Sequence, residues 1–588
     1  MSKRMKIQMP DTLTLEDNAR LALGAIIGVA DDDYDYIPFF NGDFKAKPAV
    51  MHHGNWDYGS SHGRLVDAIF LVRRMTGSDY GKEIEQHYRE NLFSFLGKHG
   101  LSYRRNSFPA ELSAEYQSKF KDSASMIDQR STLLAFCTWY EETKDEKVRQ
   151  AADTLCAGLK HIARKDREFW YYPASEYTDE GWPSFDAVHT RLAVDPCAFW
   201  GRQIGPLLRW HELTGNRDAF ELCENFACYI MEHSSVFHTD GSWSAAHEYR
   251  DGHAHTRMGT LASLLHLGCF TGDARMIAFA KKSFDWALDN LCTSFGWTPG
   301  DLHNQQYEHE TCTLSDAIDC ALQLAKCGYS EYWAVAERFV RNQLTEAQLK
   351  ETSWITQLDT RENDVHGKIT YYRVGDRLKG AFAGYAAPND FVYDGPWGRG
   401  HIMDVQTCCL GAGTRALYLA WENAVTRTHN GRISVNLLLN HSSHWVDVRS
   451  YLPYVGRLEL DIKEELPDLL VRIPEWTPFG AVEVKISTAS GERIECTGRE
   501  LPWVKGRFIR IPQVHKGCLV TVAFPMMKRH TRERAATLYY EVDWQGDDVI
   551  GISPDGNYYP LYKNRLVYQN EAPCVEKMLC EYEGDDLQ

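Results

Sequence analysis

The sequence predicts an α + β multidomain protein. An α/α six-hairpin toroid, or barrel, is expected over residues 1–430, followed by an antiparallel β-sandwich with a C-terminal extension over residues 431–588. Three observations support this prediction. Helical segments recur in pairs before residue 430, the hydrophobic period changes from 3.6 to 2 after Asn430-Gly431, and a chain of 588 residues is too long for one ordinary core.

Short turn signals separate the two predicted helices of each pair. In these turns a glycine or a small polar residue ends one helix, and an Asp or Asn starts the next. The spacing of the turns, about 55 to 70 residues, accommodates two helices and their connections per unit. Tandem hairpins can stack as an open solenoid or close into a ring, and the long, aromatic-rich loops favour the ring. The turns are Thr76-Gly77-Ser78-Asp79, Thr143-Lys144-Asp145, Thr214-Gly215-Asn216, Thr271-Gly272-Asp273 and Cys327-Gly328-Tyr329.

Alternating apolar and polar residues replace the helical pattern in the C-terminal part of the chain. Seven short segments of this kind, separated by turn residues, are typical of strands in an antiparallel sandwich. They cover residues 433–437, 445–448, 458–462, 469–473, 482–486, 507–511 and 519–524.

Composition limits the partners and the compartment. A formal net charge of -17 argues against a nucleic-acid or anionic-membrane partner and favours a neutral ligand such as a carbohydrate. No apolar stretch is long enough for a signal peptide or a membrane span, which predicts a cytoplasmic protein. Most of the 16 cysteines, including Cys137, Cys156, Cys228 and Cys269, fall in apolar helical patterns and are expected to be buried free thiols.

Two cysteine motifs stand at predicted helix starts. Glu310-Thr311-Cys312 precedes Thr313-Leu314-Ser315-Asp316, which has the form of a capping box, and Cys408-Cys409 precedes a second helical stripe. Three thiols and a carboxylate are a set of ligands that one Zn²⁺ ion could collect. A purely structural zinc site remains open as an alternative, and so does a vicinal disulfide between Cys408 and Cys409.

Aromatic and histidine side chains in the predicted loops are candidates for sugar binding. Aromatic faces pack against the C–H surfaces of a sugar ring, and polar side chains hold its hydroxyls. The candidates are Trp56, His253, His255, Trp297 and Trp397. Lid packing is the alternative role for each loop tryptophan.

Together these motifs resemble the cysteine-dependent, zinc-containing β-L-arabinofuranosidase family of glycoside hydrolases. The resemblance covers roughly residues 60–530 and includes Leu470-Val471-Arg472-Ile473-Pro474-Glu475-Trp476. It implies that Glu310, Cys312, Cys408 and Cys409 bind zinc and that Cys408 is also the nucleophile. It also implies a sugar-contacting histidine in the motif His253-Ala254-His255-Thr256.

The chain departs from the family at the general acid. The family places a glutamate about sixteen residues before the glutamate ligand, and in this chain that position is Ser294. Asp301 and Glu308 are the candidates to replace it, since a leaving group without a proton donor departs slowly. The chain is therefore interpreted as a divergent member.

The resulting hypothesis is a retaining exo-glycoside hydrolase that releases a small, β-L-arabinofuranose-like sugar through zinc-bound Cys408. Two alternatives remain open. One is a polysaccharide lyase or sugar epimerase on an α/α toroid, with His253 or Tyr249 as the base. The other is a non-catalytic carbohydrate-binding protein with structural zinc. The sequence leaves monomer and homodimer both open.

Overall fold

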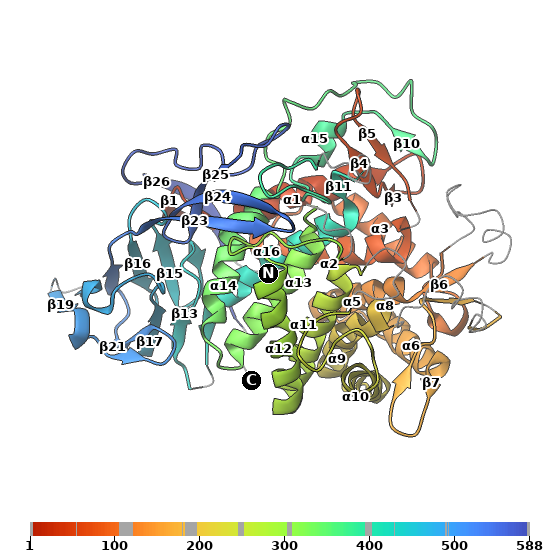
Figure 1. Ribbon diagram of the computed structural model, residues 1–588, viewed down its shortest axis with the longest axis horizontal. Coiled ribbons are helices and arrows are strands. Elements are labelled where there is room, and N and C mark those ends of the chain that lie inside the picture. Colours follow the sequence, from red (N-terminus) through yellow and green to blue (C-terminus); the bar gives the residue numbers. More distant parts are fainter. Residues whose placement is uncertain are drawn as a thin grey trace.

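The structure is a computed structural model. It describes residues 4–54, 56–104, 122–178, 180–182, 197–244, 252–302, 308–393, 403–428, 430–488, 491 and 493–584. A helical region is followed by a sheet-rich C-terminal region, as the sequence predicts. Figure 1 shows the helices at the centre and right of the molecule and most of the C-terminal strands at the left.

Six helices pack against one another in a closed cycle, in which each contacts the next and the last returns to the first. Because their neighbours cover them on nearly every side, they lack a broad polar face, as Ala254–Thr271 illustrates. In order they are α2 (His62–Thr76), α5 (Met126–Thr143), α9 (Ile204–Thr214), α11 (Ala254–Thr271), α13 (Thr311–Lys326) and α16 (Thr407–Ala424).

A second set of helices packs outside this cycle, and most of these helices bury one face only. In α6, for example, Val148, Ala152, Leu155 and Leu159 are buried at helical spacing. Each contacts a member of the cycle. The set comprises α1 (Leu15–Gly28), α3 (Lys82–Ser94), α6 (Glu146–Ile162), α10 (Arg217–Glu232), α12 (Ala274–Asn290) and α14 (Tyr332–Phe339).

The predicted turns between paired helices are confirmed. Gly77, Gly215 and Gly272 end their helices with φ values of 58°, 76° and 70°, in the left-handed region that glycine adopts without strain. Asn216 and Asp273 then cap the next helices, and their side chains accept hydrogen bonds from the backbone N–H of Ala219 and of Arg275 and Met276. The local sequence thus specifies where these hairpins turn.

The change from helix to strand falls between Ala424 and Val425. The two sheets that follow share one buried apolar cluster. The first sheet has the order β12 (Val425–Arg427), β13 (Ile433–Val435), β17 (Leu466–Arg472), β21 (Phe508–Val514) and β20 (Trp503–Val504). The second has the order β14 (His441–Ser442), β15 (Val446–Ser450), β16 (Arg457–Ile462), β22 (Leu519–Ala523), β18 (Glu483–Ser487) and β19 (Arg493–Thr497).

One strand pair differs from the purely antiparallel expectation. β13 and β17 run parallel, with Ile433 opposite Leu469. The reason is topological, since the intervening strands β14, β15 and β16 belong to the other sheet and the chain crosses back before β17.

The last part of the chain returns to the helices. β23 (Lys528–Ala535), β24 (Leu538–Gln545) and β25 (Asp548–Ser553) form a three-stranded sheet. Its apolar residues, among them Val542 and Trp544, join the hydrophobic cluster of the helical region. β26 (Cys574–Cys580) pairs antiparallel with β1 (Arg4–Pro10), which brings both ends of the described chain together. The predicted boundary at residue 430 stays a prediction.

Buried charges connect the helical region to the strands. Glu337 in α14 accepts a hydrogen bond from Arg341 Nε at 2.7 Å, and its second oxygen binds Arg472 of β17 and the N–H of Leu438. Arg341 also reaches Asp548 of β25 at 3.3 Å. Because both arginines and Glu337 are almost completely buried, each charge depends on its partners.

One cysteine pair corrects the free-thiol expectation. Cys269, near the end of α11, forms a disulfide with Cys327, which follows α13. Cys137 and Cys156 are buried free thiols, as expected, and Cys228 is a half-buried one. Sequence reasoning missed the disulfide because the neighbouring packing of α11 and α13 brings together two residues that are 58 positions apart.

Candidate metal and active site

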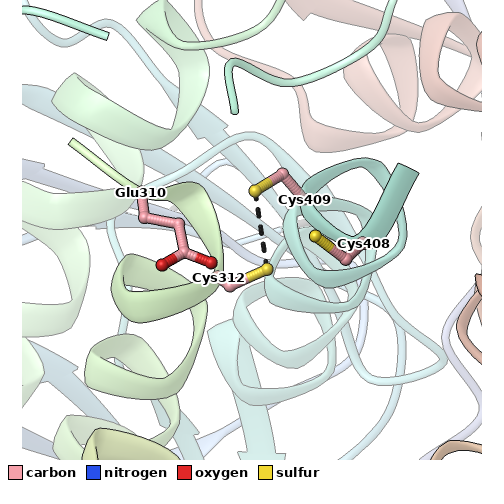
Figure 2. A group of neighbouring side chains, drawn as sticks. All are labelled: Glu310, Cys312, Cys408 and Cys409. Atoms are coloured by element: carbon pink, nitrogen blue, oxygen red, sulfur yellow. Dashed lines mark hydrogen bonds between the residues drawn. The ribbon is translucent and has the colours of Figure 1, made fainter. Parts of the chain in front are cut away.

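The two cysteine motifs meet where α13 and α16 begin. Glu310 is the N-cap residue of α13, Cys312 lies in its first turn, and Cys408 and Cys409 lie in the first turn of α16. One ligand atom from each of the four residues lies within 4.8 Å of all the others. Figure 2 shows the side chains pointing toward one another, with 3.5 Å between the sulfurs of Cys312 and Cys409.

This donor set fits a zinc ion. Zn–S bonds of about 2.3 Å in a tetrahedral site place two sulfurs a little under 4 Å apart, close to the separations found between these residues. Thiolates select soft or borderline metals over calcium and magnesium, which prefer oxygen. Glu310, Cys312, Cys408 and Cys409 could therefore hold a metal ion, and Cys408 is the only partly exposed member of the four.

Backbone and hydroxyl hydrogen bonds fix the two helix starts. Thr407, just before Cys408, donates its N–H to Phe40 O at 2.9 Å and its hydroxyl to Phe39 O. Thr311, next to Cys312, donates its hydroxyl to Ala383 O at 2.8 Å. Helix α13 starts at Thr311, so the expectation of a capping box at Thr313 is wrong, because extended Glu310 already precedes the first turn.

Strand β11 (Val405–Gln406) leads directly into the cysteine pair. It is the edge of a four-stranded sheet with the order β10 (Ile369–Thr370), β5 (Val50–His52), β4 (Asn41–Asp43) and β11. One turn into the two helices, the hydroxyl of Ser315 donates to Ala412 O at 2.8 Å. The sheet fixes the start of α16, and this hydrogen bond links α16 to α13.

Arg64 in α2 supplies positive charge to the thiols. One of its terminal nitrogens lies 3.3 Å from the Cys312 sulfur and 3.3 Å from the carbonyl oxygen of Cys408. Hydrogen bonds from Cys312 and Cys409, together with the Arg64 charge, hold the pKa of Cys408 well below its usual range. Burial instead raises the pKa of Cys312 to about 11 and also raises that of Cys409. Cys408 is thus the thiol that ionises first.

The two candidate histidines have different environments. The side chain of His253 is 38% exposed, and its Nε2 lies 2.7 Å from Glu310 Oε2. His255 is buried, with its Nδ1 2.6 Å from Asp316 and its Nε2 facing the guanidinium groups of Arg64 and Arg202. Burial and these two arginines hold the pKa of His255 well below its usual range. A neutral His255 therefore donates from Nδ1 and accepts at Nε2. Because His255 is buried, His253 is the histidine of the two that a ligand can reach.

Both candidate acids lie beside the four-residue cluster. The backbone of Asp301 pairs with that of His253, and the carbonyl oxygen of Glu308 accepts a hydrogen bond from Gly300. Both acids and two residues of the cluster act on the same side chain, Tyr385. Burial raises the pKa of Tyr385, and the charges of Glu310, Asp301, Glu308 and Cys409 raise it further. Glu308 is almost fully buried and Asp301 is half-buried, so Asp301 is the more accessible acid.

Ser294 lies at a different place. Its hydroxyl donates to Glu533 Oε1 of β23 at 2.6 Å, and its N–H donates to the other carboxylate oxygen at 3.1 Å. Both contacts are exposed. They hold Ser294, the position that the resemblance assigns to the general acid, against β23.

The structure describes two of the three candidate tryptophans. Trp56 is half-buried, and the guanidinium of Arg104 lies 4.4 Å from its ring centroid. Trp297 is fully buried in the helical core, so a sugar contact from its side chain would require the surrounding structure to open. Trp397 and Tyr249 lie outside the described residues. The substrate-binding roles of all three tryptophans stay predictions.

Sequence reasoning missed Arg64 and Tyr385. Arg64 stands four residues before Ala68, on the same helical face as the apolar residues that are buried in α2. An arginine on such a face was the available signal. No local pattern marks Tyr385, because it reaches the cluster from a segment without helix or strand.

Comparison with known proteins shows a likeness of fold. No family model matches the sequence, and no curated protein does. Among solved structures, a GH127 β-L-arabinofuranosidase from Geobacillus stearothermophilus T6 superimposes with a TM-score of 0.57 at 13% identity, covering 92% of this chain and 80% of that one. A second GH127 β-arabinofuranosidase gives 0.57 at 13% identity, covering 91% and 79%.

A third structure, described as a glycoside hydrolase, gives a TM-score of 0.56 at 12% identity and covers 93% of this chain and 83% of that one. The chain thus shares, over nearly its whole length, the fold of these glycoside hydrolases. Among the helices in the described ranges, none is long and apolar enough to cross a membrane.

Proposed function

We propose that this protein is a retaining exo-glycoside hydrolase that releases a β-L-arabinofuranose-like sugar through Cys408. The observation that carries the proposal is the convergence of Glu310, Cys312, Cys408 and Cys409 in a fold shared with GH127 β-L-arabinofuranosidases. The same likeness supports a closed six-hairpin toroid followed by a β-sandwich. A carbohydrate is the proposed partner.

In the first step the Cys408 sulfur attacks the anomeric carbon. A C–S bond forms, the bond to the leaving-group oxygen breaks, and Asp301 donates the proton that this oxygen needs. Cys408 suits this role because it is the most exposed and most acidic of the three thiols. Zinc, when bound by the four residues, would keep their thiols deprotonated.

In the second step water attacks the same carbon from the side that the leaving group occupied. The C–S bond breaks, the thiolate of Cys408 is restored, and Asp301 takes up the proton from the water. Two inversions at the anomeric carbon give net retention. His253 is the proposed contact for a sugar hydroxyl, which its partly exposed side chain and its hydrogen bond with Glu310 support.

The experiment combines metal analysis with a substitution at the nucleophile. Purified protein is expected to contain one zinc ion per chain, and Cys408→Ser should abolish arabinofuranoside hydrolysis while the three other ligands retain metal. An arabinofuranose-shaped electrophile should label Cys408, as located by peptide mass spectrometry. Cys496→Ser, at an exposed thiol, is the matched control. Hydrolysis by Cys408→Ser, or labelling elsewhere, would contradict the proposal.

A further inference from the structure

A small cavity lies inside the cycle of helices, one turn beyond the cysteine cluster. Its volume is about 30 Å³, and α2, α5, α11, α13 and α16 all contribute to its wall. On α13 and α16 the wall begins at Ser315 and Gly411, which follow Cys312 and Cys408 by three residues each. The cavity is therefore separate from the four ligands but shares Arg64 with them.

Three arginines and three aspartates, Asp67, Asp316 and Asp319, line this wall. Arg64, Arg130 and Arg415 line the cavity, and Arg202 lies behind it against His255. Two of the lining carboxylates have other partners, because Asp67 is held by Arg415 at 2.9 Å and Asp319 by His266 at 3.0 Å.

The third lining carboxylate, Asp316, lies against His255 at 2.6 Å. The charges of Arg202, Arg130 and Arg64 all act on this carboxylate.

Three guanidinium groups in this region have an unused donor. The Nε atoms of Arg64, Arg130 and Arg202 are buried and have no hydrogen-bond partner among the described residues. Arg64 is only 5% exposed and Arg202 only 2%, so water does not solvate them freely. A buried charged donor without a partner is costly, which makes this cluster a place where an added anion would be stabilised.

The electrostatic effect on Arg130 agrees with this geometry. Burial and the like charges of Arg64, Arg202 and Arg415 lower the pKa of Arg130 to about 9, against the opposing effect of Asp316. An anion beside Arg130 would reverse part of that effect.

We propose that this cavity binds one halide ion, chloride under ordinary conditions, between Arg64 and Arg130. Size selects the ion, because about 30 Å³ has room for about two water-sized particles at most. A phosphate, sulfate or sugar acid is too large, whereas a monatomic anion fits. The proposal does not depend on the hydrolase function, since it rests on the arginines and the cavity alone.

Halide binding would also position Arg64 for the cysteine cluster. A terminal nitrogen of Arg64 contacts Cys312, while its Nε has no partner of its own. An anion that takes up this free donor would hold the guanidinium in the orientation seen against the sulfur.

Chloride NMR linewidths of the full-length protein in sodium gluconate buffer test the proposal directly. Added chloride should show excess broadening that sodium bromide displaces and that sodium sulfate of equal ionic strength leaves unchanged. Arg130→Gln should weaken chloride binding at least about tenfold, as expected for the loss of one hydrogen bond from a charged group. Arg149→Gln, at an exposed helix position, should leave it unchanged.

Thermal melting provides the second measurement. The Tm of the wild type should rise with chloride and bromide relative to gluconate, because a ligand of the native state stabilises it. This increment should vanish in Arg130→Gln and persist in Arg149→Gln. Absence of excess broadening in the wild type, equal displacement by sulfate, or an unchanged chloride increment in Arg130→Gln would each overturn the proposal, and the first two do not require the variant to fold.

Discussion

The guanidinium of Arg64 lies 3.3 Å from the sulfur of Cys312, although the two residues are 248 positions apart in the chain. This contact joins α2 to the starts of α13 and α16. It places a buried positive charge beside three thiols and one carboxylate. When all four are ionised, they carry more negative charge than a divalent cation can balance.

Arg64→Met is expected to weaken zinc binding by about 10- to 100-fold, the usual effect of removing a residue that supports metal ligands. The charge that favours ionised Cys312 and Cys408 is then lost. Competition with a chromophoric chelator measures the dissociation constant. Arg64→Lys should recover part of the affinity, and Arg149→Met should match the wild type. An unchanged zinc affinity in Arg64→Met would show that the contact has no electrostatic role.

Asp301→Asn is expected to lower kcat/KM by about 10²- to 10⁴-fold on substrates with a poor leaving group, because the proton donor of the first step is gone. The loss should be much smaller on an aryl arabinofuranoside whose leaving group departs without protonation. Parallel assays on alkyl and aryl substrates measure the difference. If Glu308→Gln shows this dependence on the leaving group and Asp301→Asn does not, Glu308 is the acid.

Glu337→Gln is expected to lower the free energy of unfolding by about 3–5 kcal/mol, the usual cost of leaving buried charges without their partner. Here Arg341 and Arg472 would both lose the carboxylate. Urea unfolding measures the change. Glu90→Gln, at an exposed helix position, is the control and should fall within about 0.5 kcal/mol of the wild type.

The same carboxylate predicts a pH dependence. Burial by itself would raise the pKa of Glu337, but Arg472 and Arg341 outweigh it and lower the pKa below its usual value. Stability from Glu337 is therefore fully present above the unfolded-state pKa, about 4.3, and is lost as the pH falls through the lower folded-state pKa. Unfolding free energies measured down this range should decline less steeply in Glu337→Gln than in the wild type.

Cys269→Ser is expected to lower the free energy of unfolding by about 2–4 kcal/mol, because the disulfide to Cys327 restrains the unfolded chain. Denaturation with and without a reducing agent measures this. Reduction should destabilise the wild type and leave Cys269→Ser unchanged. Equal stability of the two proteins under oxidising conditions would mean that the bond is absent in solution.

Much of the fold could be predicted because its signals are local. The turn at Thr271-Gly272-Asp273 contains both a left-handed glycine and a capping carboxylate, so it specifies the end of α11 and the start of α12. The change of hydrophobic period likewise predicted strands after Gly431, although β12 already begins at Val425. The parallel pairing of β13 with β17 could not be predicted, since it depends on which sheet each intervening strand joins.

The candidate site, like the fold, could be predicted only in part. The types of residue in Glu310-Thr311-Cys312 and Cys408-Cys409 already indicated a metal, because three thiols and a carboxylate are zinc ligands whatever holds them. Packing between helices far apart in the chain decided the rest. It brought the four ligands together, placed Arg64 against Cys312, and left His253 partly exposed while burying His255.

By itself, the sequence determined the local structure and the available chemistry: where helices end, where strands begin, and which side chains can bind a metal or attack a carbon. Only the tertiary structure decided which charges surround those side chains and which of them a ligand can reach. The physical reason is the separation along the chain over which each interaction acts. Capping, turns and periodicity act over a few residues, whereas burial and Coulomb interactions depend on segments that meet only when the cycle of helices has closed.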